Sequence, residues 1–99
     1  MGNWVSFWIA ELRFDPSTEA KFRWEKGFSP EKLVQDFVGS RKLKGRFESS
    51  PLHGDRWFVF QADEVLPRVV LIVKAVSEPH DIWRVVTAFR TSNPKYVGR

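Results

Sequence analysis

The chain has 99 residues, of which 42% are hydrophobic and 15% aromatic, and it carries a formal net charge of +4. This length predicts one domain, residues 1–99, with a single core, and the absence of cysteine excludes disulfides and thiolate-bound metals. Acidic and basic residues balance up to residue 64, so the excess charge falls in residues 65–99. Such asymmetry predicts a polyanionic partner, most often nucleic acid.

The N-terminal stretch predicts a β-strand over residues 4–13, because Val5, Phe7 and Ile9 alternate with the residues between them. Glu11 and Arg13 interrupt this apolar run. We therefore expect neither a signal peptide nor a membrane span, no contact with a membrane, and a cytoplasmic location.

Two helices with recognisable ends are predicted next. The first starts at Asp15 and Pro16 and stops at Gly27. The second has Ser29 as its N-cap and Pro30 at its first position. Its apolar stripe consists of Leu33, Val34, Phe37 and Val38.

The rest of the chain predicts one loop and three strands. Residues 40–56 combine basic residues with Gly, Ser and Pro, which indicates a loop. Strands are expected near residues 57–62, 68–76 and 82–90. The order β-α-α-β-β-β predicts an α+β fold, in which two helices pack on one face of a twisted antiparallel sheet.

Alternation along the strands predicts which side chains face the helices. The covered side is expected to hold Phe58, Phe60, Val69, Leu71, Val73, Ala75, Trp83, Val85 and Phe89. The opposite side then collects four cations that a ligand can reach, namely Arg68, Lys74, Arg84 and Arg90.

Two stretches of the sequence resemble a known family. They are "RFDPSTEAKFRWEKGFSPEKLVQDF" and "WRVVTAFR". Together with the order of elements, they are similar to the BrnT-type toxins of the RelE/ParE toxin superfamily. The resemblance implies a RelE-like fold and a toxin that cleaves RNA, usually messenger RNA, without metal or cofactor. It also implies a cognate antitoxin protein as a partner.

Cleavage of RNA through its 2′-hydroxyl needs a base, an acid, and cations that stabilise charge on the phosphate. Arg84 and Arg90 are our candidates for the phosphate, because the planar guanidinium binds two phosphate oxygens. The candidates for proton transfer are Lys74, His53 and Tyr96.

Further cations are expected to bind the RNA chain. They are Arg68, Lys42, Lys44, Arg46 and Lys95, and three of them lie in the run "RKLKGR", where Leu43 and Phe47 interleave as in single-strand binders. The expected strands hold no carboxylate cluster and the two histidines are isolated, so no metal site is expected.

Other interpretations remain open. Arginines on a strand often serve solubility or protect an edge, Lys74 and His53 are of types that are usually solvated, and Thr87 fits a core hydroxyl. The whole chain fits a non-catalytic module that binds nucleic acid or an acidic protein on the same face. It also fits an inactive RelE-fold protein, because Lys26 stands where the family usually has His.

Overall fold

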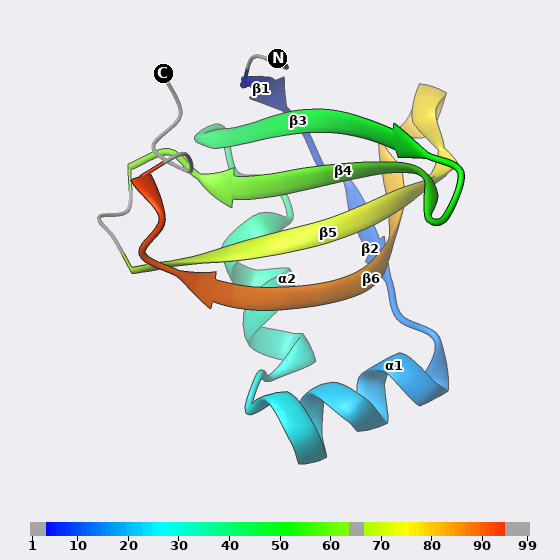
Figure 1. Cartoon of the computed structure of the whole chain (residues 1–99), viewed down its shortest axis with the longest axis vertical. Helices are drawn as coiled ribbons and strands as arrows, with labels where there is room; N and C mark the ends of the chain where they lie inside the picture. Colours follow the sequence, from blue (N-terminus) through cyan, green and yellow to red (C-terminus); the bar gives the residue numbers. More distant parts are fainter. Residues whose placement is uncertain (1–3, 64–66, 95–99) are drawn as a thin grey trace.

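The computed structural model describes residues 4–63 and 67–94, with only the backbone described at residues 25 and 26. A six-stranded curled sheet has the order β1-β3-β4-β5-β6-β2 and is accompanied by two short α-helices (Figure 1). The predicted α+β class is confirmed. In chain order the elements are β1 (Val5–Phe7), β2 (Glu11–Arg13), α1 (Pro16–Lys21), η1 (Phe22–Lys26), α2 (Pro30–Phe37), β3 (Leu43–Ser50), β4 (Gly54–Gln61), β5 (Arg68–Ser77), η2 (Glu78–His80) and β6 (Ile82–Thr91).

The expected single strand over residues 4–13 is wrong. Its first part, β1, pairs antiparallel with β3 at one edge of the sheet, and its second part, β2, pairs parallel with β6 at the other edge. The short segment between them passes behind the sheet (Figure 1). The Ile9 side chain in this segment is fully buried. Two hydrogen bonds hold the backbone of the segment: Gly39 N donates to the carbonyl of Ile9 (2.9 Å), and Trp83 Nε1 donates to the carbonyl of Trp8 (3.2 Å). The chain therefore links both edges of the sheet.

Both predicted helices are present, and their ends lie where the capping residues indicated. The first runs from α1 into the π-helical segment η1 and ends at Gly27, whose φ of 67° suits glycine. The second begins after Ser29, whose side chain accepts a hydrogen bond from Lys32 N (3.2 Å). Leu33 and Phe37 of α2 are buried against the sheet. Within the described residues, no helix is long and apolar enough to cross a bilayer.

Residues 40–56 do not form the expected loop. Most of them belong to a β-hairpin, in which β3 pairs antiparallel with β4 over its full length and a short turn follows Ser50. The polar composition concealed a period of two, because Leu43, Gly45 and Phe47 alternate with Lys44, Arg46 and Glu48. The hairpin places Lys44, Arg46 and Arg56 of the supposed loop on the sheet.

Gly45 allows β1 to lie close against β3. A Cβ on Gly45 would come within 2.8 Å of Phe7 Cδ1, and the Phe7 ring is held between Trp57 and Trp83, with centroid distances of 5.0 and 4.7 Å. We expect Gly45→Ala to destabilise the protein by about 1–3 kcal/mol because the overpacked ring cannot move freely. Urea unfolding measures this change.

The companion variant Phe7→Leu provides the control for this prediction. Removing the ring relieves the clash, so the double variant should lose less stability than the sum of the two single losses. Additive losses would show that the added methyl group at Gly45 does not act through Phe7.

The helices cover the face of the sheet that carries Val69, Leu71 and Val73, as predicted. The expectation for β4 is wrong, since Trp57 and Val59 point toward the helices and Phe58 and Phe60 point away. All four residues are apolar, so alternation could not identify the buried side. The register decides it, because Val59 pairs with Leu71.

The face assigned to Arg90 is also corrected by the structure. Val73 pairs with Val85 but Ile72 pairs with Thr87, so Val86 is an extra residue in β6 and forms a β-bulge. The bulge reverses the alternation beyond it. The covered face holds Trp83, Val85 and Ala88 instead of Phe89, and Arg90, which pairs with Val69, lies on that face too. Arg84 and Arg90 therefore point to opposite sides of the sheet.

Candidate nucleic-acid interface

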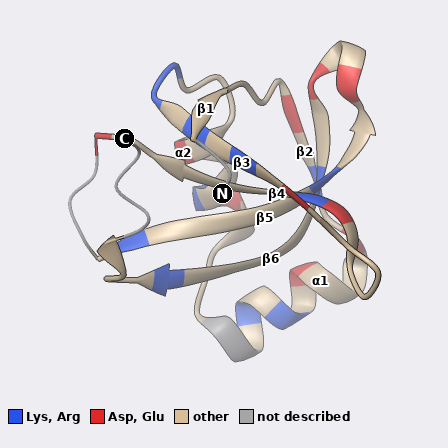
Figure 2. Ribbon diagram, turned by 45° about the horizontal axis from the view of Figure 1, so that its top comes forward, with Lys and Arg blue, Asp and Glu red and all other residues tan. Residues whose placement is uncertain are grey.

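The face of the sheet that carries no helix, here called the helix-free face, combines aromatic rings with cations. Figure 2 shows basic positions distributed along β3, β5 and β6. Strand pairing assigns to this face Lys44, Arg46 and Glu48 of β3, Arg56, Phe58 and Phe60 of β4, Arg68, Val70, Ile72 and Lys74 of β5, and Arg84, Thr87 and Phe89 of β6. Thr87 thus lies on the Phe89 side, as expected, but away from the helices.

Two arginines flank one carboxylate at the centre of the hairpin. Arg56 Nη2 donates a hydrogen bond to Glu48 Oε1 (3.2 Å), and Arg46 Nη2 lies 3.8 Å from Glu48 Oε2. Both guanidinium groups lie over the ring of Phe58, with Cζ to centroid distances of 5.0 Å for Arg56 and 5.9 Å for Arg46. Arg46 also lies 5.0 Å from the Trp4 ring. Cation–π contacts and the shared carboxylate fix both planar groups in position.

Exposure differs within this group. The Glu48 side chain is 39% exposed, whereas those of Arg46 and Arg56 are 19% and 15% exposed. The Arg56 Nε is buried and makes no hydrogen bond within the described part of the chain. The Glu48 carboxylate is therefore the most exposed member of the group, and the two guanidinium groups are mostly covered.

Arg68 is buried, which corrects the expectation that a ligand can reach it. Only 5% of the residue is exposed, its Cζ lies 4.7 Å from the centroid of Phe60, and its Nη1 donates to the carbonyl of Gln61 (3.0 Å). Arg68 thus supports the aromatic layer, because its guanidinium lies over the Phe60 ring and is bonded to the backbone.

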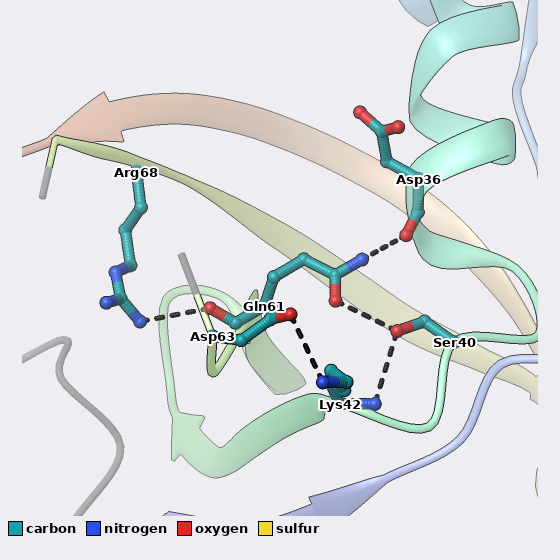
Figure 3. Close-up of polar contacts among 6 residues, drawn as sticks. All are labelled: Asp36, Ser40, Lys42, Gln61, Asp63 and Arg68. Atoms are coloured by element: carbon teal, nitrogen blue, oxygen red, sulfur yellow. Dashed lines mark hydrogen bonds and ion pairs between the residues drawn. The ribbon is translucent and has the colours of Figure 1, made fainter. Parts of the chain in front are cut away.

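Gln61 connects several segments, as Figure 3 shows. Its Nε2 donates to the carbonyl of Asp36 at the end of α2, and its Oε1 accepts from Ser40 Oγ (2.8 Å). Lys42 N donates to the same Ser40 hydroxyl (3.2 Å), and Lys42 Nζ lies 3.5 Å from Asp63 Oδ2. Lys42 is exposed but precedes β3, so it belongs to this polar network and not to the row of Lys44 and Arg46.

The proton-transfer candidates lie in different places. Lys74 is half-buried on the helix-free face, and its Nζ is 3.6 Å from the position of a Cβ on Gly54, where the hairpin turn ends. His53 is exposed in that turn, and its backbone N donates to Ser50 Oγ (3.0 Å). Tyr96 and the RNA-binding candidate Lys95 lie outside the described residues.

The two phosphate candidates are separated by the sheet. Arg84 is on the helix-free face, where its side chain is 41% exposed and its Nη1 lies 3.5 Å from Asp15 Oδ2. Arg90 is exposed on the other side, with its Cζ 4.4 Å from the ring centroid of Phe28. One phosphate cannot contact both residues, so their expected joint action is not supported by this arrangement.

Glu48 and Arg56, the residues that organise the interface, were not predicted as site residues from the sequence. Both were assigned to a loop, and their juxtaposition depends on the pairing of Glu48 with Arg56 across the hairpin. The alternation of Lys44, Arg46 and Glu48 was the signal that could have identified the strand. Within residues 4–63 and 67–94, no three His, Asp or Glu side chains lie close enough together to hold a metal ion.

Comparisons with models of protein families, with curated proteins and with solved structures find no match for this chain.

Proposed function

We propose that this protein binds single-stranded RNA on the helix-free face. The observation that carries the proposal is the pair of guanidinium groups, Arg46 and Arg56, fixed over Phe58 on either side of Glu48. Preorganised guanidinium forks suit phosphate oxygens because they lose little freedom on binding. Further cations lie on the same face and extend the basic surface along the sheet, namely Lys44, Lys74 and Arg84.

Aromatic residues on this face favour a single strand over a duplex. Trp4 and Phe89 are half-buried and border the cations. Unpaired bases can stack on such rings, whereas the bases of a duplex are already stacked on each other. A polyanion is also favoured over an acidic protein surface, because the cations follow neighbouring strands in rows, as the phosphates of a nucleic acid follow one another.

Glu48 favours cleavage of the bound RNA as a second candidate function. In this reaction the Glu48 carboxylate accepts the proton of a 2′-hydroxyl, whose oxygen forms a bond to the adjacent phosphorus. The bond from phosphorus to the 5′-oxygen breaks, and Lys74 or His53 protonates the leaving oxygen. The products are a 2′,3′-cyclic phosphate and a 5′-hydroxyl. Arg46 and Arg56 stabilise the charge that develops on the phosphorane oxygens.

A RelE-like arrangement is part of this proposal, supported by the sequence resemblance and by two helices that precede consecutive antiparallel strands. The chain adds β1 and β3 to the order expected for such a protein. A role as a toxin with a cognate antitoxin, and a cytoplasmic location, stay predictions from the resemblance and the composition.

Salt dependence of RNA binding tests the proposal. For a single strand, each lost phosphate contact should lower the slope of log K against log salt by about 0.7. We expect Arg84→Ala to lower the slope by this amount, and the triple alanine variant of Lys44, Lys74 and Arg84 to lower it by about 2. Titration of a labelled uridine oligomer at several salt concentrations gives both slopes.

Arg90→Ala provides the matched control, because it removes the same side chain from the same strand on the opposite face. Its slope should equal that of the unaltered protein. If Arg90→Ala reduces the slope and the triple variant does not, RNA binds on the helix-covered side and the proposed interface is incorrect.

A further inference from the structure

A second surface lies on the helix-covered side, around the turn between η1 and α2. One cavity of about 330 Å³ is lined by Phe28, Leu33, Phe37, Val69 and Arg90, with polar atoms from Ser29, Lys32 and Asp36. A shallow depression lined by Arg23, Trp24 and the turn itself adjoins it. The cavity and the depression share Gly27, Phe28 and Ser29, and together they are here called the turn groove.

Trp24 is the most unusual residue of the turn groove. It is 84% exposed, although the protein buries most of its other aromatic side chains at least partly. Tryptophan is rarely left in water over so much of its surface, and it is among the residues that contribute most to binding at protein interfaces. A large exposed ring beside an apolar cavity is typical of an anchor for a partner.

The charges around the turn groove are unequal in their pairing. Arg23 donates a hydrogen bond to Glu31, and this contact holds the pKa of the Glu31 carboxyl below its ordinary value and raises that of Arg23. Lys32 is paired with Asp36 at 2.9 Å. Arg90 contacts the ring of Phe28 but has no carboxylate partner among the described residues. One cation of the groove is thus available to an anion.

From this arrangement we infer that the turn groove binds a segment of a partner protein in which a large apolar side chain stands next to an Asp or Glu. The apolar side chain enters the cavity over Phe28 and Leu33 and contacts Trp24. The neighbouring carboxylate pairs with the Arg90 guanidinium, whose planar fork accommodates both of its oxygens. The partner segment therefore needs one large apolar residue and one adjacent Asp or Glu.

A nucleic acid fits this groove less well than a protein segment. Of its three cations, Arg23 pairs with Glu31 and Lys32 with Asp36, so Arg90 is a single cation beside an apolar floor and does not continue a row of cations that could follow successive phosphates. The floor includes Leu33 and Val69, whose aliphatic side chains suit an apolar side chain more than a flat base. This surface is also separate from the proposed RNA interface, because the bulge at Val86 places Arg90 on the other side of the sheet from Arg84.

Selection from a displayed library of short random peptides tests the inference on the full chain. Selected peptides are expected to share a large apolar residue adjacent to Asp or Glu. When such a peptide is synthesised and titrated by fluorescence anisotropy, Trp24→Ala and Arg90→Ala should each weaken its binding by about tenfold or more. Arg84→Ala should leave the peptide affinity unchanged, because Arg84 lies on the opposite face.

Four results would overturn this assignment. Selected peptides that lack acidic residues would contradict the pairing with Arg90. Peptides that bind both variants as well as the unaltered protein would exclude the turn groove as their site. A uridine oligomer that loses affinity in Trp24→Ala would assign the groove to nucleic acid. Self-association that depends on Trp24, measured by sedimentation at increasing protein concentration, would show that a second copy of the chain occupies it.

Discussion

Glu48→Gln should slow RNA cleavage by about two to four orders of magnitude, which is the usual contribution of a general base. The amide keeps the size of the side chain and its ability to accept the hydrogen bond from Arg56, but it cannot take a proton from a 2′-hydroxyl. RNA affinity should be maintained or increase, because the change removes a negative charge from a basic face. Single-turnover cleavage of a labelled RNA in the presence of EDTA measures the rate, and a parallel titration measures the affinity.

Two control variants test whether the loss of cleavage rate is specific to Glu48. Asp55→Asn alters another carboxylate of the same hairpin, which is bonded to Ser49 Oγ and faces away from the cluster of Arg46, Glu48 and Arg56. Arg90→Ala alters a cation on the opposite face. Neither change should reduce the rate by more than a small factor.

The chemical end of the cleaved RNA, and whether the unaltered protein cuts RNA at all, decide between binding alone and cleavage. A 5′ fragment that ends in a cyclic phosphate is expected if the 2′-hydroxyl attacks. Full activity in Glu48→Gln would reject Glu48 as the base. An unaltered protein that binds RNA with the predicted salt dependence but never cuts it would leave the helix-free face as a binding surface alone.

Local signals in the sequence predicted the helices because the capping interactions are local. Ser29 bonds to a backbone group three residues away, and Gly27 adopts the positive φ that ends η1. The strands β5 and β6 were predicted for a similar reason, since their apolar, β-branched runs need a sheet to bury them. The helix ends therefore depend on interactions within a few residues, and the two strands were recognised from the composition of each run.

The errors occurred where distant contacts decide the structure. The faces of β4 and of the end of β6 could not be derived from alternation, because both sides of these strands are apolar. Phe58, Phe60 and Phe89 lie on the helix-free face, and Val59 and Ala88 lie on the covered face. The bulge at Val86 reverses the orientation of every residue after it. The candidate site was affected directly, since Arg90 was assigned to the wrong face by this reversal.

The cations of the candidate site were identified singly, but their grouping was not. Lys44 and Arg46 were found from composition, and Lys74 and Arg84 from alternation in strands that exist as expected. The contact of Arg56 with Glu48 depends on the register of a hairpin that was interpreted as a loop. Composition therefore indicated a basic surface, and only the pairing of β3 with β4 showed a carboxylate held between two arginines.

Ile9 holds together the two halves of the N-terminal segment, and Ile9→Ala should lower the free energy of unfolding by about 2–5 kcal/mol. The side chain is fully buried between the helices and the sheet, and the flanking backbone is fixed by bonds to Gly39 and Trp83. A cavity at this position is costly because the crossing segment, tied to both edges of the sheet, cannot collapse into it. A protein of this size has about 5–15 kcal/mol of total stability, and each kcal/mol lost lowers the midpoint of thermal unfolding by about 4–8 degrees, so the midpoint should fall by roughly 8–40 degrees.

Val5→Ala is the matched control, because Val5 is 47% exposed in the same segment and its loss should cost less than about 1 kcal/mol.

Hydrogen exchange distinguishes the role of Ile9 in closing the sheet from ordinary core packing. If the crossing segment positions both β1 and β2, their amides, which lie at opposite edges of the sheet, should lose protection together in Ile9→Ala while those of β4 and β5 remain protected below the unfolding transition. Equal loss of protection in all strands would assign Ile9 to the general core. A loss of stability no larger than that of Val5→Ala would contradict the burial on which the prediction rests.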